Sequence, residues 1–314
     1  MNENELSVTM RSEPVPWFGL FFSWITMILG IENPAVKRTI IELIPGDLLS
    51  VSAVANGEAD IGMTTPPACV TMAYRGVGPY PEKMGNLRGI LSFPHDDRLV
   101  WAVAADLGVN SIEELKDKEL TFAIGGKDSP VGFAVKKILE AYGMPLEQQA
   151  KKNWKVIEED YLFKVISHGI QGKADVVIHE GRKTPPWAKL TQSREMTFLP
   201  IRDDIVDMMS EQYGFRKAVL SQGMIDGAVK KDVLTLDWSG WSMFTRADVS
   251  DELIYLITKI VVEYKHLFEM GFKGQDLEHS DLVYPMEPSE IWRNTGVPLH
   301  PAAERYFKEN GYMA

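Results

Sequence analysis

The segment Gly125–Ser129, GGKDS, combines residue types that can bind an anion. Its glycines, including Gly126, permit a tight turn, Lys127 carries a positive charge, and Ser129 is the expected N-cap of the helix that follows. The N–H groups and the dipole at a helix N-terminus favour a negatively charged group. The same residues would also suit an ordinary capped turn with a solvated Lys127, and Asp128 opposes an anion unless it faces away. The spacing is not that of a GxxxxGK[ST] phosphate-binding loop.

Further candidates follow predicted strands nearer the N-terminus. Arg11 could hold a carboxylate through two hydrogen bonds, or it could pair with Glu13 at the surface. Trp17 begins an apolar helix. If the Trp17 ring faces the ligand, the ligand is expected to have an apolar or aromatic body; otherwise the ring belongs to the core. The other candidates place a side-chain oxygen at a strand end or helix start: Ser12, Asp47, Thr64 and Thr65. Asp47 and Thr65 could also act simply as helix caps.

His179 and Glu180 end another predicted strand. The pair could serve as a general base or as metal ligands, but no HExxH motif follows. Glu263 and His266 form one half of a carboxylate–histidine metal motif, and their helix lacks the second half. We therefore expect His179 and Glu180 to contact a ligand, and we expect no catalytic residue, no metal site and no cofactor.

The elements that must position these residues alternate between strands and helices. This alternation predicts an α/β fold with mostly parallel sheets flanked by helices. The predicted strands are a short one before Arg11, then Arg38–Ile44, Ala59–Met63, Leu99–Ala105, Leu120–Gly125 and Ala174–His179. The predicted helices are 17–31, 47–57, 65–76, 129–143, 161–172 and 251–270, with a last one starting at His300 and Pro301. Ser111 and Glu114 predict a capping box for one more short helix.

The apolar run Trp17–Ile31 covers 15 residues, fewer than the roughly 20 needed to span a bilayer. We expect it to form a buried helix, with no insertion into a membrane.

Two sequence similarities within the chain suggest two related lobes. ANGEADIGM at Ala55–Met63 parallels QGKADVVIH at Gln171–His179, and AVAADLGVNSIEEL at Ala102–Leu115 parallels MFTRADVSDEL at Met243–Leu253. We expect the second pair of strands to carry the chain between the lobes. The predicted division is 1–105 for the first part of lobe 1, 106–235 for lobe 2, and 236–314 for the return to lobe 1.

The composition excludes several classes of protein. The 314 residues include 33 Lys and Arg and 44 Asp and Glu, so the formal charge is 33 − 44 = −11. An acidic chain without a long basic run is a poor partner for nucleic acid or for an anionic membrane. Hydrophobic residues make up 45%, which is enough for a full core. The single cysteine, Cys69, rules out an internal disulfide and a thiolate zinc site.

The motifs together resemble the solute-binding subunits of TRAP-type transporters, in particular the TAXI (TRAP-associated extracytoplasmic immunogenic) group. The resemblance covers nearly the whole chain. It is carried by ANGEADIGM, LRGILSF, the run from Asp96 to Gly126, FTRADVSDELIYLITK, and most specifically PLHPAAERYFKENG at Pro298–Gly311. Members of the family usually carry a Gly-Ser-Gly-Thr type of loop where this chain has Lys-Asp-Ser-Pro, and a glycine-rich stretch where it has RSEPVPWFG.

The resemblance implies a two-lobed type II periplasmic-binding-protein clamshell that captures a small organic anion, a carboxylate, in the cleft between its lobes. It implies TRAP membrane permease subunits as partners. The location would be periplasmic if an export signal has been removed, and cytoplasmic if Met1 is the native start. Replacing Lys127 or Arg11 with alanine should weaken an anionic ligand by about 1.5–3 kcal/mol.

The alternative is a cytosolic enzyme on the same fold, a decarboxylase or desulfinase of an aromatic acid. Two observations favour it. The start, Met1–Gly19, has no cationic segment followed by an apolar one, as an export signal would have. Cys69 lies early in a predicted helix, whose dipole could lower the pKa of its thiol.

Overall fold

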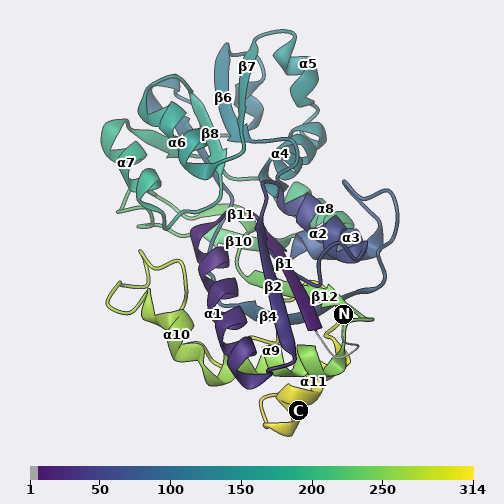
Figure 1. Cartoon of the computed structure of the whole chain (residues 1–314). Coiled ribbons are helices and arrows are strands. Elements are labelled where there is room, and N and C mark those ends of the chain that lie inside the picture. The colour runs from purple at the N-terminus through teal and green to yellow at the C-terminus, as the bar shows by residue number, and fades with distance from the viewer. Residues whose placement is uncertain (1–5) are drawn as a thin grey trace. The chain divides into compact units, whose positions relative to one another are not determined.

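The computed structural model describes residues 6–314, which form two compact units (Figure 1). Unit 1 contains the described residues up to His95, together with Gly240–Gln275 and Leu282–Ala314. Unit 2 contains Asp96–Ser239 and a short excursion, Asp276–Asp281. The chain is therefore an α/β protein of two lobes.

The sheet of unit 1 has the strand order β2-β1-β3-β12-β4. Its strands are β1 (Leu6–Ser12), β2 (Val36–Leu43), β3 (Ile61–Thr64), β4 (Leu87–Phe93) and β12 (Trp241–Arg246). Strand β1 pairs in parallel with β2 and β3, while β12 is antiparallel to both β3 and β4. The parallel strands β1, β2 and β3 consequently end at one edge of the sheet.

The main sheet of unit 2 repeats this arrangement with the order β7-β6-β8-β5-β9. Its strands are β5 (Val100–Ala104), β6 (Leu120–Gly125), β7 (Trp154–Glu159), β8 (Val176–His179) and β9 (Met196–Phe198). Strand β6 is parallel to β7 and β8, and β5 is the antiparallel strand. A separate antiparallel pair, β10 (Arg216–Leu220) and β11 (Val233–Asp237), completes the strands of this unit.

The predicted boundary at residue 105 differs from the one in the structure. It would assign β5 to the first segment of lobe 1, whereas β5 belongs to unit 2. The reason is its pairing, because β5 bonds to β8 on one side and to β9 on the other. The units meet along the chain at 95/96 and 239/240, and the chain crosses twice more around 276–281.

The helices largely confirm the alternation predicted from the sequence. Those of unit 1 are α1 (Pro16–Glu32), α2 (Asp47–Ala55), α3 (Ala68–Arg75), α9 (Asp251–Glu263), α10 (Lys265–Met270) and α11 (Pro301–Glu309). Those of unit 2 are α4 (Pro130–Ala141), α5 (Leu146–Ala150), α6 (Leu162–Ile170), α7 (Pro185–Ser193) and α8 (Asp203–Tyr213). The expected start of the last helix at His300 and Pro301 is confirmed. The structure adds that the His300 side chain caps this helix by accepting a hydrogen bond from Ala302 N at 3.2 Å.

Three local predictions need correction. Helix α3 begins after Pro67, not at Thr65, because a residue before proline is pushed away from the helical conformation. The predicted helix 251–270 is two helices that meet at Tyr264. The expected capping box at Ser111 opens only a single 3-10 turn, in which the Glu114 carboxylate accepts from Asn110 N at 3.1 Å.

The Ala-Asp similarity predicted from the sequence corresponds to one repeated set of contacts. In unit 1, Thr9 N donates to the Asp60 carboxylate at 2.8 Å, and Asp60 N donates back to the Thr9 carbonyl. In unit 2, Thr121 N donates to the Asp175 carboxylate at 2.9 Å, with the same return bond. In each unit the aspartate ties the start of its strand to the neighbouring parallel strand, β1 in unit 1 and β6 in unit 2, which explains why the two segments are alike.

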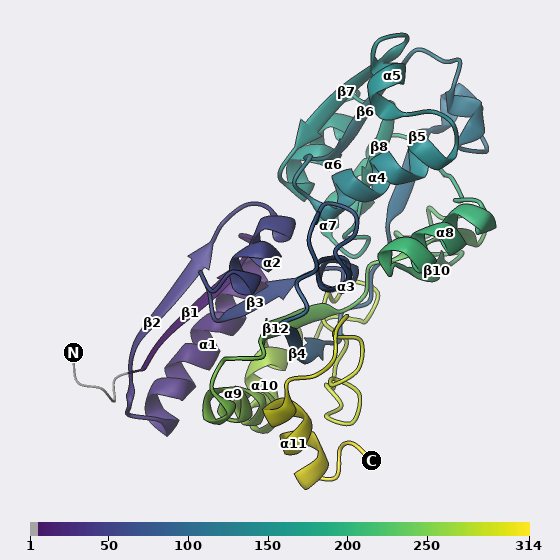
Figure 2. The same cartoon turned by 90° about the vertical axis from the view of Figure 1, so that its right-hand side faces the viewer.

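Helix α1 is the centre of the core of unit 1, where it packs against β2 and α9 (Figure 2). Phe18, Phe21, Phe22, Ile25 and Leu29 are fully buried in it. The prediction of a buried first helix is therefore confirmed. Over residues 6–314, none of the helices combines the length and the apolar character needed to cross a membrane.

Candidate functional site

The GGKDS loop joins the end of β6 to the start of α4 in unit 2. The Ser129 hydroxyl accepts from Gly132 N at 3.0 Å and donates to the Gly126 carbonyl at 2.7 Å. Gly126 N in turn donates to the Glu159 carbonyl, at the end of the neighbouring strand β7, at 3.0 Å. These bonds use both the donor and the acceptor of Ser129, so the predicted cap is confirmed and the loop is held firmly against the helix start.

The tip of this loop is the part open to solvent. Lys127 and Asp128 are exposed, while Gly125 and Gly126 are buried. The structure therefore leaves the Lys127 ammonium available to an incoming anion, but it leaves the Asp128 carboxylate equally available.

Gly132 is needed for the close approach between this loop and α4. A Cβ atom at this position would lie 2.2 Å from the Gly126 carbonyl oxygen, a backbone atom that cannot move without moving the loop. We expect Gly132→Ala to lower the free energy of unfolding by about 1–3 kcal/mol, as in other overpacked sites. Urea denaturation measures this effect.

Gly126→Ala is the matched comparison for Gly132→Ala. Its Cβ would meet the end of the Asp160 side chain at 2.4 Å, and that side chain can rotate away. We expect a smaller loss of stability from this variant. Equal losses in the two variants would contradict the argument from backbone contact.

His179 and Glu180 follow β8, the strand next to β6. His179 is buried, and its Nδ1 lies 3.6 Å from the Glu180 carboxylate. Ile124 in β6 pairs with Ile178 in β8, so the residues that follow these two strands leave the sheet side by side. The structure thus brings His179 and Glu180 to the same sheet edge as the GGKDS loop.

In unit 1 the corresponding edge is polar and buried. Ser12 pairs with Met63, and Thr64 pairs with Ser242 in β12. The side chains of Ser12, Thr64 and Ser242 are fully buried, and Thr65 is 8% exposed. Buried hydroxyl groups therefore lie at the ends of β1 and β3.

Asp47 lies in the first turn of α2, with Gly46 as the N-cap. The prediction that Asp47 caps this helix is therefore wrong by one residue. Its carboxylate is 2% exposed and close to Cys69 and Tyr80. Burial raises the pKa of the Cys69 thiol well above its usual value, and the charge of Asp47 raises it further. The pKa of Cys69 is thus raised, not lowered as a helix dipole would have it.

Arg11 and Trp17 have partners within unit 1. The Arg11 guanidinium lies 2.6 Å from the Glu42 carboxylate and 3.1 Å from that of Glu58. The expected surface pair with Glu13 is replaced by these two, and an incoming anion would have to compete with both carboxylates. The Trp17 ring packs against Phe272 with centroids 4.2 Å apart, as expected of a residue at the edge of the core.

A cluster of charged residues beside β8 was not anticipated from the sequence. Asp97 is fully buried, and its carboxylate accepts from the backbone N–H groups of Gly181 and Arg182 at 2.5 and 2.9 Å. Lys183 follows directly and is also buried. The sequence signal that could have revealed this cluster is the Gly-Arg-Lys run after a predicted strand, a place where cations are unusual.

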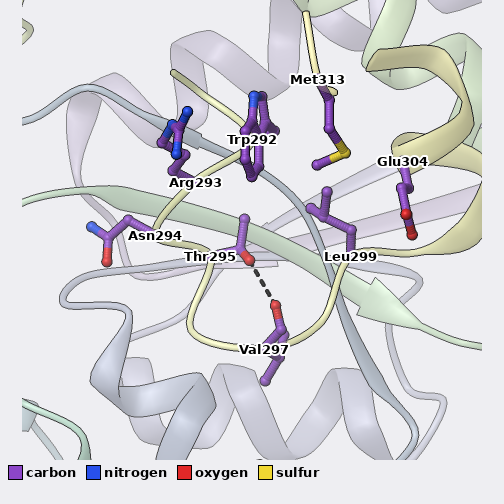
Figure 3. A pocket seen from close by; sticks show the side chains of 8 residues that line it. All are labelled: Trp292, Arg293, Asn294, Thr295, Val297, Leu299, Glu304 and Met313. Atoms are coloured by element: carbon purple, nitrogen blue, oxygen red, sulfur yellow. Dashed lines mark hydrogen bonds between the residues drawn. The ribbon is translucent and has the colours of Figure 1, made fainter. Parts of the chain in front are cut away.

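Unit 1 has a surface hollow of about 490 Å³ near the C-terminus (Figure 3). Trp292, Leu299 and Met313 supply apolar surface, and the Thr295 hydroxyl donates to the Val297 carbonyl at 2.7 Å. The Glu304 carboxylate is already paired with a lysine of the same helix. None of the candidate residues from the sequence lines this hollow.

Several solved structures share the fold of this chain. TctC solute-binding protein from Polaromonas matches with 11% identity over 99% of both chains and a TM-score of 0.53. PhnD1 from Prochlorococcus marinus, solved with methylphosphonate, matches with 12% identity over 98% of both chains and a TM-score of 0.55. XAC2383 from Xanthomonas citri, solved with chloride, matches with 11% identity over 96% of this chain and 95% of that one, with a TM-score of 0.56. The chain therefore has the two-lobed fold of solute-binding proteins.

A family model matches residues 35–311, and the chain belongs to the NMT1-like family. The expectation of a solute-binding-protein fold is confirmed by both findings. Membership of the TAXI group stays a prediction.

Proposed function

We propose that this protein is the solute-binding receptor of a TRAP-type transporter and that it captures a small organic anion of the carboxylate class. The observation that carries the proposal is the GGKDS loop, where an exposed Lys127 stands at the end of a parallel strand and a capped helix begins at Ser129. This is the place in an open α/β sheet where ligands bind. The receptor would deliver its solute to membrane permease subunits outside the cytoplasm.

In this proposal the charge contact comes from unit 2. Lys127, His179 and the backbone of the loop in unit 2 contact the anionic group. Arg11 in unit 1 is already paired with two carboxylates, so it is the weaker candidate for a charge contact.

The direct test is a thermal-shift screen of organic acids, followed by calorimetry on any acid that stabilises the protein. A ligand at 100 times its dissociation constant should add about 2.7 kcal/mol of stability. We expect Lys127→Ala to weaken the binding of such an acid by about 1.5–3 kcal/mol, because a charge-assisted hydrogen bond is lost.

Lys151→Ala is a matched control for this lysine. Lys151 is exposed in the same unit and precedes β7. Because β7 is parallel to β6, Lys151 lies at the opposite edge of the sheet from the GGKDS loop, which follows β6. Binding that is unchanged in both variants would mean that the anion contact has been misassigned. Genes for a TRAP permease beside this one, and a leader upstream of Met1, would support the transport role and the location.

The chemistry of Cys69 separates a receptor from the enzyme alternative. Because the thiol is buried and its pKa is raised, we expect it to react with a thiol reagent at least about a hundredfold more slowly in the folded protein than in urea. We also expect Cys69→Ala to retain ligand binding. Rapid modification of the folded protein, or turnover of an aromatic acid that depends on Cys69, would favour the enzyme.

A further inference from the structure

A cavity of about 510 Å³ lies wholly within unit 2, beside the start of α7. Arg182, Lys183 and Lys189 line it, together with acidic residues and with apolar surface from Pro185 and Ile225. Its volume is in the range of sites for small organic molecules, which is roughly 300–1,000 Å³. The cavity is therefore large enough for more than a single ion.

The Lys183 side chain is buried, and its ammonium makes few polar contacts. Its side chain is 3% exposed, and its nearest carboxylate oxygen, Oδ2 of Asp96, lies 3.6 Å away. Within the described residues 6–314, this is the only ion pair of the Lys183 ammonium, and none of their oxygens accepts a hydrogen bond from it. Burial accordingly lowers the pKa of Lys183.

Arg182, the neighbouring residue, is also incompletely bonded. Its side chain is 1% exposed; one terminal nitrogen bonds to Asp96 and the other lies 3.3 Å from the Glu278 carboxylate. Its Nε is buried and has no hydrogen-bond partner among the described residues. Arg182 Nε is thus a buried donor without an acceptor among the described residues, which is uncommon in folded proteins. Beside it, Lys183 lines the cavity with one ion pair and no hydrogen bond among the same residues.

The carboxylates around these cations do not accept hydrogen bonds from Lys183 Nζ or Arg182 Nε. Burial would raise the pKa of Asp96, but the charges of Arg182, Arg98 and Lys183 outweigh it and lower the pKa to about 2. Glu278 is engaged by Arg182, and Asp226, which also lines the cavity, lies 2.8 Å from His279. Asp97 also acts on Lys183 through its charge, so the acids near the two cations are not outnumbered. What the cluster lacks among the described residues is a hydrogen-bond acceptor for Lys183 Nζ and for Arg182 Nε.

We propose that this cavity binds a small organic oxyanion, a carboxylate or a phosphate ester, whose oxygens accept hydrogen bonds from Lys183 and from Arg182 Nε. Such a group supplies several acceptors at once and compensates a buried charge. The site is separate from the GGKDS loop and does not depend on the protein being a transport receptor.

The test compares the melting temperature of the full chain in phosphate, citrate or succinate with that in chloride at equal ionic strength. We expect at least one of these oxyanions to raise the melting temperature by about 3 °C or more. Stabilisation by phosphate alone would indicate a phosphate ester as the ligand, and stabilisation by citrate or succinate would indicate a carboxylate. We expect Lys183→Met to abolish the rise, and Lys151→Met, the exposed control, to keep it. Circular dichroism checks that each variant is folded.

Three results would overturn the inference. The first is that none of the oxyanions stabilises the wild type. The second is that the stabilisation persists in Lys183→Met. The third is that it persists in Lys183→Met and is also lost in Lys127→Ala. The last result would assign the anion to the proposed solute site instead. If Lys183→Met does not fold, crystals of the wild type soaked in the stabilising oxyanion decide the matter: density beside Lys183 Nζ supports the inference, and density only elsewhere contradicts it.

Discussion

Replacing Asp97 with alanine should lower the free energy of unfolding of unit 2 by about 3–5 kcal/mol. The buried carboxylate accepts hydrogen bonds from three backbone N–H groups, those of Arg98, Gly181 and Arg182, at 2.5–2.9 Å. Alanine would leave all three donors without an acceptor in the interior. Urea denaturation followed by circular dichroism measures the loss.

Two further variants test the cause of this loss. Asp97→Asn keeps one side-chain oxygen as an acceptor, so we expect roughly half of the effect. Asp117→Ala removes an exposed carboxylate in the same unit, and we expect a change within about 0.5 kcal/mol. If Asp97→Ala were no more harmful than Asp117→Ala, these three backbone groups would not depend on the carboxylate.

The second large effect is expected at Phe21 in α1, whose replacement by alanine should cost about 3–5 kcal/mol. Phe21 is fully buried, and its ring centroid lies 4.6 Å from that of Phe93 and 5.2 Å from that of Phe268. The substitution leaves a cavity that neighbouring rings from three different elements cannot fill. Hydrogen exchange should show the loss of protection in unit 1.

Phe163→Ala is the control for the core, because this phenylalanine is 49% exposed at the start of α6. We expect a change of less than about 1 kcal/mol from it. A similar loss in both variants would mean that the rings around Phe21 rearrange to fill the space.

The GGKDS loop shows what local sequence can predict. The glycines, Ser129 and the following proline act within a few residues of one another, so the strand, the turn and the capped helix could each be inferred from neighbours in the chain. The Ala-Asp similarity is a second example, since Asp60 and Asp175 make the same contacts in the two units. Such signals depend on spacing that is visible in the printed sequence.

The contacts of Arg11 show where that inference stops. The sequence suggested Glu13 as its partner, but the parallel pairing of β1 with β2 brings Glu42 beside Arg11 instead. Glu58 reaches the same guanidinium from beyond α2. Pairing across strands joins residues far apart in the chain, and charge alone does not say which of the 44 acidic residues will be selected.

The buried cations of unit 2 depend on tertiary structure in the same way. Arg182 and Lys183 meet Asp96 and Asp97 only because β8 pairs with β5, across more than eighty residues of intervening chain. The same pairing decided that β5 belongs to unit 2.

By itself, the sequence determined the α/β class, the buried first helix and the loop that begins α4, because hydrophobic periodicity and capping act over short distances. Only the tertiary structure decided which charges are buried, which partners they have and where the units divide. Burial and ion pairing depend on residues that folding brings together, and the chain order does not record those distances.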